Sequence, residues 1–82
     1  MTEWRPLAEK GDAAAQWSLG TMYAEGQGVP QDYVLAHMWM NLAVAKGVQE
    51  VVKGRDLLEK NMTTDQIAEA QRLAKEWTPK RK

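Results

Sequence analysis

Apolar residues recur at intervals of three and four along most of the chain, the spacing that places them on one face of a helix. This pattern predicts helices over about residues 12–24, 32–46 and 49–60, and a last helix from about residue 64 to just before Pro79. A shorter apolar set, Trp4, Leu7 and Ala8, predicts a half-helix within residues 1–11. The helix over 32–46 is expected to bury one stripe, formed by Tyr33, Ala36, Trp39, Met40 and Ala43 and widened by Leu35 and Leu42.

Capping signals mark the ends of these helices. Lys10-Gly11 and Lys46-Gly47 are the same stop signal, because glycine takes the left-handed cap conformation at low cost. Asp12 and Asp32 stand where a carboxylate can cap the following helix. Thr63 and Gln66 fit a capping box at the start of the last helix.

The glycines inside the first full hairpin predict its packing. Gly20 lies in the middle of a helix, where glycine costs roughly 1 kcal/mol relative to alanine, so another helix is expected to cross there closely. Gly26, Gly28 and Pro30 predict a tight loop, with Val29 turned inward. A phosphate-binding role for this loop is disfavoured, because no strand precedes it and no Lys-Ser/Thr pair follows.

The repeated Lys-Gly stop indicates an internal repeat. Setting Gly11 on Gly47 gives a period of 47 − 11 = 36 residues, typical of helical-hairpin repeats. The predicted organisation is one domain over 1–82, with a half-helix of a preceding repeat at 1–11, a full repeat at 12–47, a C-terminal capping repeat at 48–78 and a basic tail at 79–82. In the second copy Arg55 and Asp56 replace the Leu19-Gly20 pair, so its first helix is expected to pack less closely.

Composition narrows the function classes. Eleven basic residues balance eleven acidic ones, so no overall charge attracts nucleic acid or anionic lipid, and only the basic tail offers a minor nucleic-acid alternative. There is no cysteine, which excludes disulfides and thiolate metal sites. No apolar run has the length of a signal peptide or a membrane span, so as written the chain is expected to be cytoplasmic, or exported if an upstream segment is missing.

No constellation for catalysis is visible. His37 is the only histidine, and no carboxylates are spaced to complete a metal site with it. It is expected on a helix surface, beside Met38 and Trp39. Ser18 has no base at a suggestive spacing, and Glu25 and Asp32 are explained as helix-end charges. The sequence therefore predicts no enzyme activity, no cofactor and no metal.

One full repeat and the glycine loop resemble the Sel-one-like repeat, a relative of the tetratricopeptide repeat with a longer glycine-rich loop, and the ending resembles that of many bacterial members. The resemblance implies an all-α fold of antiparallel helical hairpins stacked as a short right-handed α-solenoid, and it implies work as an adaptor or scaffold for protein–protein contacts. The residues that carry it are Ala8, Gly11, Ala15, Leu19, Gly20, Tyr23, Gly26, Gly28, Val29, Asp32, Ala36, Trp39, Ala43 and Gly47.

The tryptophans separate core positions from candidate binding positions. Trp39 and Trp77 lie on apolar stripes and are expected in the core. Trp17 lies on the opposite side of its helix from Ala15 and Leu19, where it either anchors a partner or packs against an adjacent helix. The predicted partner-binding face on the concave side consists of Trp17, Thr21, Ala24, Lys53, Leu57 and Lys60.

A second hypothesis places function at the N-terminal edge. Trp4 and Leu7 have no predicted cover, and an uncovered apolar edge favours association. The chain would then form a homodimer or dock on a preceding repeat.

Overall fold

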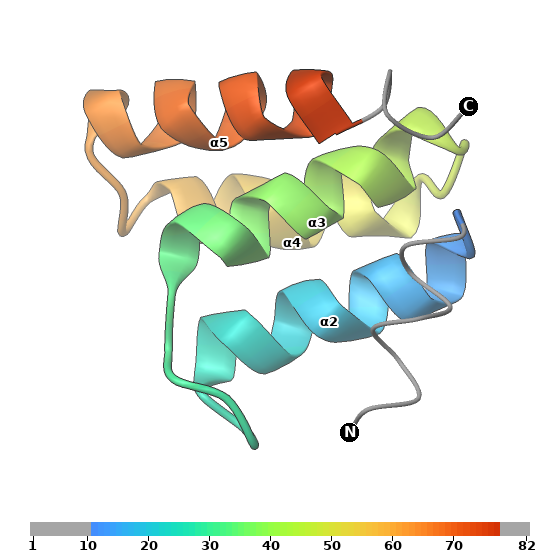
Figure 1. Cartoon of the computed structure of the whole chain (residues 1–82), viewed down its shortest axis with the longest axis horizontal. Helices are drawn as coiled ribbons and strands as arrows, with labels where there is room; N and C mark the ends of the chain where they lie inside the picture. Colours follow the sequence, from blue (N-terminus) through green and yellow to red (C-terminus); the bar gives the residue numbers. More distant parts are fainter. Residues whose placement is uncertain (1–10, 78–82) are drawn as a thin grey trace.

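The computed structural model describes residues 11–77, and every regular element among them is an α-helix (Figure 1). The helices are α2 (Ala13–Glu25), α3 (Tyr33–Ala45), α4 (Glu50–Glu59) and α5 (Thr64–Trp77). The predicted all-α fold is confirmed, and the predicted helix limits agree with these bounds to within a residue or two.

The first two helices begin at the aspartates that the sequence indicates. The Asp12 side chain accepts a hydrogen bond from the Ala15 backbone N–H at 3.0 Å, and Asp32 accepts one from Leu35 at 3.1 Å. Each carboxylate thereby satisfies a backbone donor that has no partner within its own helix.

The loop between α2 and α3 reverses the chain with glycines in the left-handed region. Gly26 caps α2 at φ 71°, and Gly28 has φ 76°, values that other residues adopt at a cost. The reversal is closed by two hydrogen bonds, from the Asp32 backbone N–H to the Tyr23 carbonyl at 2.9 Å and from the Gln31 side chain to the Ala24 carbonyl at 2.8 Å.

Gly20 marks the close crossing of α2 and α3 that its position predicts. A Cβ atom built on Gly20 would lie 2.8 Å from Met40 Cγ and 3.1 Å from the Ala36 backbone oxygen. Both distances are shorter than ordinary van der Waals contact, so only glycine lets the two helix backbones approach this closely.

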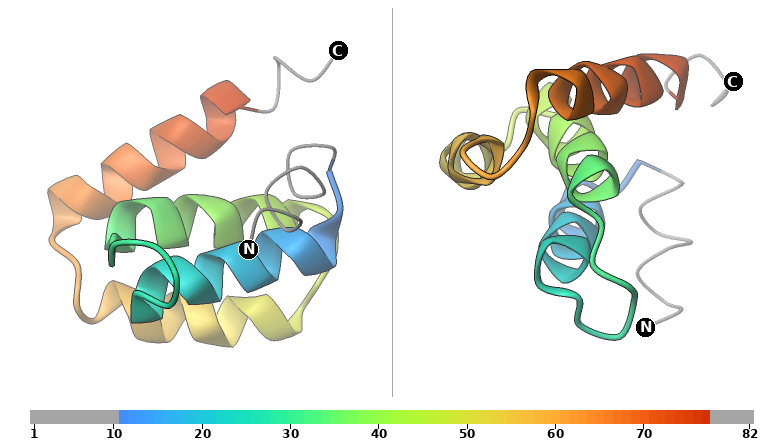
Figure 2. Two further views of the ribbon diagram at one scale, coloured as in Figure 1. Left: turned by 60° about the horizontal axis from the view of Figure 1, so that its bottom comes forward. Right: turned by 90° about the vertical axis from the view of Figure 1, so that its left-hand side faces the viewer.

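Helix α3 is the centre of the fold, because α2, α4 and α5 all pack against it (Figure 2). The right-hand view shows α3 between α2 below it, α5 above it and α4 to one side. Most of the predicted apolar stripe is buried, and partners on several sides bury His37 and Met38 as well. The buried residues of α3 are Ala36, His37, Met38, Trp39, Met40, Leu42 and Ala43.

The second hairpin packs more loosely through α4. Val51 and Leu58 are the buried residues of this helix, and Gly54 lies in open space, with nothing within 4 Å of an added Cβ atom. This agrees with the expectation that the first helix of the second copy cannot repeat the close crossing made by Gly20.

Helix α5 starts with the predicted capping box and closes the core. The Thr63 hydroxyl accepts from the Gln66 N–H at 3.1 Å, while the Gln66 side chain accepts from the Thr63 N–H at 2.9 Å. At the other end Trp77 meets Trp39 edge to face, with ring centroids 5.3 Å apart and an interplanar angle of 68°. Trp39 is a core residue and Trp77 packs against the core, as their positions predict.

Several sequence predictions lie outside the described residues. They are the half-helix over residues 1–10, the self-association edge at Trp4 and Leu7, and the basic tail at 79–82. The division of the chain into repeat segments likewise stays a prediction.

Candidate functional site

The residues of the predicted partner-binding face come from α2, from α4 and from Lys60, the C-cap of α4; both helices pack on α3. In α2, Trp17 is 37% exposed and Thr21 and Ala24 are half-buried. In α4, Leu57 is 61% exposed. Lys53 and Lys60 are exposed beside it. Within residues 11–77, Trp17 and Leu57 are the large apolar side chains left exposed.

The described residues that carry the family resemblance lie in the turns and in the core. Gly11, Gly26, Gly28 and Gly47 adopt positive φ angles in the turns. Val29 and Asp32 are half-buried at the loop. The buried members of the set are Ala15, Leu19, Gly20, Tyr23, Ala36, Trp39 and Ala43. The motif therefore accounts for the scaffold and leaves the candidate binding residues outside it.

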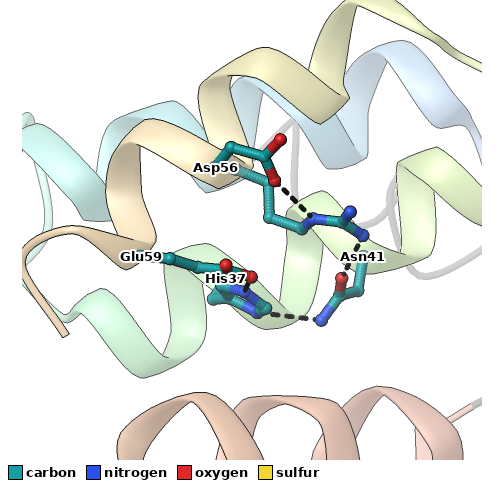
Figure 3. A network of polar contacts seen from close by, with 5 residues as sticks. His37, Asn41, Asp56 and Glu59 are labelled. Carbon is teal, nitrogen blue, oxygen red and sulfur yellow. Dashed lines mark hydrogen bonds and ion pairs between the residues drawn. The ribbon is translucent and has the colours of Figure 1, made fainter. Parts of the chain in front are cut away.

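The expectation that His37 lies on a helix surface is wrong. Its side chain is fully buried, at 0% exposure, between α3 and α4. Figure 3 shows it within a polar network that also contains Asn41 of α3 and three residues of α4, Arg55, Asp56 and Glu59. A buried imidazole needs partners for both ring nitrogens, and this network supplies them.

The network has one consistent direction of hydrogen bonding. Arg55 can only donate, so the Asn41 atom that it meets at 3.0 Å must be the amide oxygen. The Asn41 NH₂ group then faces His37 Nδ1 at 2.9 Å and donates to it.

With Nδ1 acting as an acceptor, the ring proton of His37 lies on Nε2. This nitrogen donates to the Glu59 carboxylate at 2.7 Å. The hydrogen bonds are therefore donated from Arg55 to Asn41, from Asn41 to His37 and from His37 to Glu59. In this chain the His37 imidazole is neutral.

This arrangement holds α4 against α3 and leaves the histidine without a free lone pair. Asn41 occupies Nδ1, and the proton on Nε2 is engaged by Glu59, so neither nitrogen is available to a metal or a substrate. No cluster of three or more metal-ligating side chains occurs in the part of the chain that the structure describes. His37 therefore has a structural role: its hydrogen bonds link α3 to α4.

Sequence reasoning missed this network because its two halves are far apart in the chain. His37 and Asn41 are four residues apart on one helix, and Arg55 and Glu59 are four apart on another, so each pair shares a helix face. The sequence signal that could have indicated the network is the presence of these two polar pairs. The pair His37 and Asn41 lies on α3, a helix that is otherwise almost entirely apolar. Their pairing across 14 and 22 residues is tertiary information.

Helix α5 carries a second charged group, on the surface. Arg72 donates to Glu69 at 2.7 Å and to Glu76 at 2.9 Å. These hydrogen bonds raise the pKa of the Arg72 guanidinium above its ordinary value. All three side chains are about half exposed, so this group belongs to the solvated outer face of α5.

Antiparallel helices joined by a glycine-rich turn, with a glycine at their crossing, are consistent with the helical hairpin of a tetratricopeptide-like fold. Residues 13–48 match the family model of the Sel1 repeat. The chain therefore carries a Sel1 repeat, and the resemblance to the Sel-one-like repeat family is confirmed. No curated protein matches the chain.

The match bears on function only at the level of the repeat family. Sel1 repeats generally mediate protein–protein interaction and are typically non-catalytic. Among the described residues, none of the helices has the length and apolar character needed to cross a membrane.

Proposed function

We propose that this chain is a non-catalytic adaptor or scaffold module that binds a protein or peptide on the face formed by α2 and α4. The residues proposed to contact the partner are Trp17, Thr21, Ala24, Lys53, Leu57 and Lys60. The observation that carries the proposal is the exposure of Trp17, at 37%, in a helix whose buried residues do not include it.

The packing of α2 supports this assignment. Its buried residues are Ala15, Gln16, Leu19, Gly20 and Tyr23, and Trp17 does not belong to the core cluster. Partly exposed tryptophans are frequent anchors in interfaces, because a partner can remove a large apolar area from water at little cost in side-chain entropy. Leu57 on α4 offers a second apolar contact of the same kind.

The test is a comparison of partner capture by three forms of the full chain. Wild type, Trp17→Ala and the control Gln71→Ala, an exposed position on α5, are immobilised and incubated with an extract of the source cells. Proteins retained by wild type and by the control are identified, purified and measured by titration. We expect Trp17→Ala to weaken the affinity at least tenfold, the range of an interface anchor.

Circular dichroism during urea unfolding monitors the fold of each variant. The proposal is contradicted if Trp17→Ala binds the purified partner as well as wild type does. It is also contradicted if Trp17→Ala unfolds the chain, since Trp17 would then be a structural residue.

A further inference from the structure

The polar network between α3 and α4 contains a buried donor without an acceptor. The Nε atom of Arg55 is shielded from solvent and donates to no described residue. The Asp56 carboxylate lies close by, with Oδ1 3.8 Å from this nitrogen, which is just beyond hydrogen-bond distance. The guanidinium is held instead by its Nη1 group, which donates to Asn41 at 3.0 Å (Figure 3). Arg55 therefore lies between two acceptors and is bonded to one of them.

The bond from Arg55 to Asn41 depends on the protonation state of His37. With Nδ1 unprotonated, Asn41 turns its NH₂ group to the ring and its amide oxygen to Arg55. A proton on Nδ1 would make this nitrogen a donor. Asn41 would then turn its amide over and present its oxygen to the ring, so that its NH₂ group faces Arg55. Two donors do not form a hydrogen bond, and the guanidinium has to leave Asn41.

The protonated network also gives each group a partner. The imidazolium donates to the Asn41 oxygen from Nδ1 and to the Glu59 carboxylate from Nε2, where the two atoms are 2.7 Å apart. Burial opposes a charge on the ring, and the adjacent negative carboxylate offsets this cost. The released guanidinium meets an acceptor in Asp56, which also serves the unbonded Nε. The position of Arg55 is what distinguishes the two states.

The charges on the other elements around α3 lie outside this network. Helix α2 is uncharged between its cap Asp12 and its last residue Glu25. The remaining charged residues of α4 and its C-cap are exposed, namely Glu50, Lys53 and Lys60. Those of α5 are exposed as well, namely Asp65, Glu69, Arg72, Lys75 and Glu76. Among the described residues, the ion pair of His37 is with Glu59.

We infer that the network is a proton-controlled switch, in which proton uptake by His37 turns over the Asn41 amide and moves Arg55 from Asn41 to Asp56. Imidazole ordinarily changes its charge between about pH 5 and pH 8, so mild acidification is the signal. The switch alters the surface of α4, because Asp56 is 61% exposed and becomes hydrogen-bonded to Arg55. It is a property of the chain alone and goes beyond the proposed function.

Nuclear magnetic resonance of the ¹⁵N-labelled full chain tests the switch. The pH is lowered from about 7.5 to about 5, the range in which imidazole titrates. The ring nitrogens of His37 report its protonation, and the Nε–H signal of Arg55 reports the position of the guanidinium. Arg72, which is bonded to Glu69 and Glu76 on α5, serves as the internal control. Circular dichroism at each pH monitors the fold.

The expected result is a coupled transition. In wild type the His37 ring changes from the neutral form protonated at Nε2 to the imidazolium. The Nε–H signal of Arg55 moves with the same midpoint, because this group gains an acceptor, and the Arg72 signal does not follow. In Asp56→Ala, at an exposed position, His37 still titrates but the displacement of the Arg55 signal is lost. In His37→Gln, which cannot take up the proton, the Arg55 signal shows no transition.

Four results would overturn the inference. An Arg55 signal that stays constant while the His37 ring titrates would exclude the coupling. A displacement of equal size in Asp56→Ala would exclude Asp56 as the acceptor. A ring that remains neutral down to about pH 5 would exclude the proton as the signal. Loss of the helical circular dichroism before the ring is protonated would show that the second state is not a folded one. Wild type and Asp56→Ala decide the matter even where His37→Gln does not fold.

The outcome is separate from that of the partner-binding experiment. Every measurement uses the chain without a partner, so a failed switch leaves the proposed function untouched. A failure of Trp17→Ala to weaken partner binding likewise leaves the switch untouched, since Trp17 takes no part in the network.

Discussion

Replacing two glycines by alanine, one in α2 and one in α4, tests the packing of the fold with a single chemical change. Gly20→Ala and Gly54→Ala both put a methyl group in mid-helix and both gain about 1 kcal/mol of helix propensity. They differ in surroundings. The Gly54 methyl meets nothing within 4 Å, so this variant is expected to be about 1 kcal/mol more stable than wild type.

The Gly20 methyl meets α3. Its carbon would lie 2.8 Å from Met40 Cγ and 3.1 Å from the Ala36 carbonyl oxygen. Met40 can rotate away only into a filled core, and the carbonyl belongs to the helix backbone and cannot rotate, so the helices must separate. Overpacking of this kind costs about 1–3 kcal/mol. After the propensity gain, Gly20→Ala is expected to lose up to about 2 kcal/mol.

The measurement is urea unfolding followed by far-ultraviolet circular dichroism, with thermal unfolding alongside. The free energies of the two variants should differ by about 1–3 kcal/mol, and each kcal/mol corresponds to about 4–8 °C in Tm for a chain of this size. Wild type is the common reference. Equal stabilisation by both substitutions would refute the close crossing of α2 and α3.

Two further predictions concern the polar network and the start of α5. His37→Ala is expected to destabilise the fold by about 2–4 kcal/mol, because it leaves a cavity and removes the partner of Asn41. Glu59→Gln should cost less than about 1 kcal/mol, since its amide oxygen still accepts from Nε2–H of His37. If urea unfolding gave equal losses of stability for His37→Ala and Glu59→Gln, the assigned direction of the hydrogen bonds would be contradicted. The ¹⁵N chemical shifts of the His37 ring report the same assignment. Thr63→Ala should cost about 1 kcal/mol and increase amide exchange in the first turn of α5, while Thr64→Ala, one residue later, should change neither; equal effects would show that Thr63 is not the cap.

The parts of the fold that sequence reasoning predicts are those set by residues close together in the chain. The caps at Asp12, Asp32 and Thr63 act over three residues, and the glycine stops depend on the conformation of one residue. The crossing at Gly20 is also predictable, because a glycine that costs helix stability in an otherwise regular helix needs a reason.

The environment of His37 is not set locally. On its own helix His37 lies beside the apolar stripe, and only the arrival of α4 with Arg55 and Glu59 turns an exposed imidazole into a buried one. In the repeat register Arg55 departs from the Leu19 position. Its guanidinium instead reaches Asn41 across the interface.

For the candidate binding face, too, the sequence predicts one part and only the structure shows the rest. Helix periodicity separates Trp17 from the buried side of α2, and the structure leaves its side chain partly exposed. The sequence places Leu57 on the predicted binding face. Its 61% exposure favours the binding face, because the buried positions of α4 are Val51 and Leu58.

The central position of α3 has a consequence for the independence of the two sequence copies. In a long solenoid each hairpin contacts only its neighbours, so an end can open while the rest stays folded. Here α3 belongs to the first hairpin, yet it supplies the surface on which both helices of the second one rest. Opening either hairpin uncovers the same helix. We therefore expect residues 11–77 to unfold as one cooperative unit and not to separate at the repeat boundary that the sequence predicts.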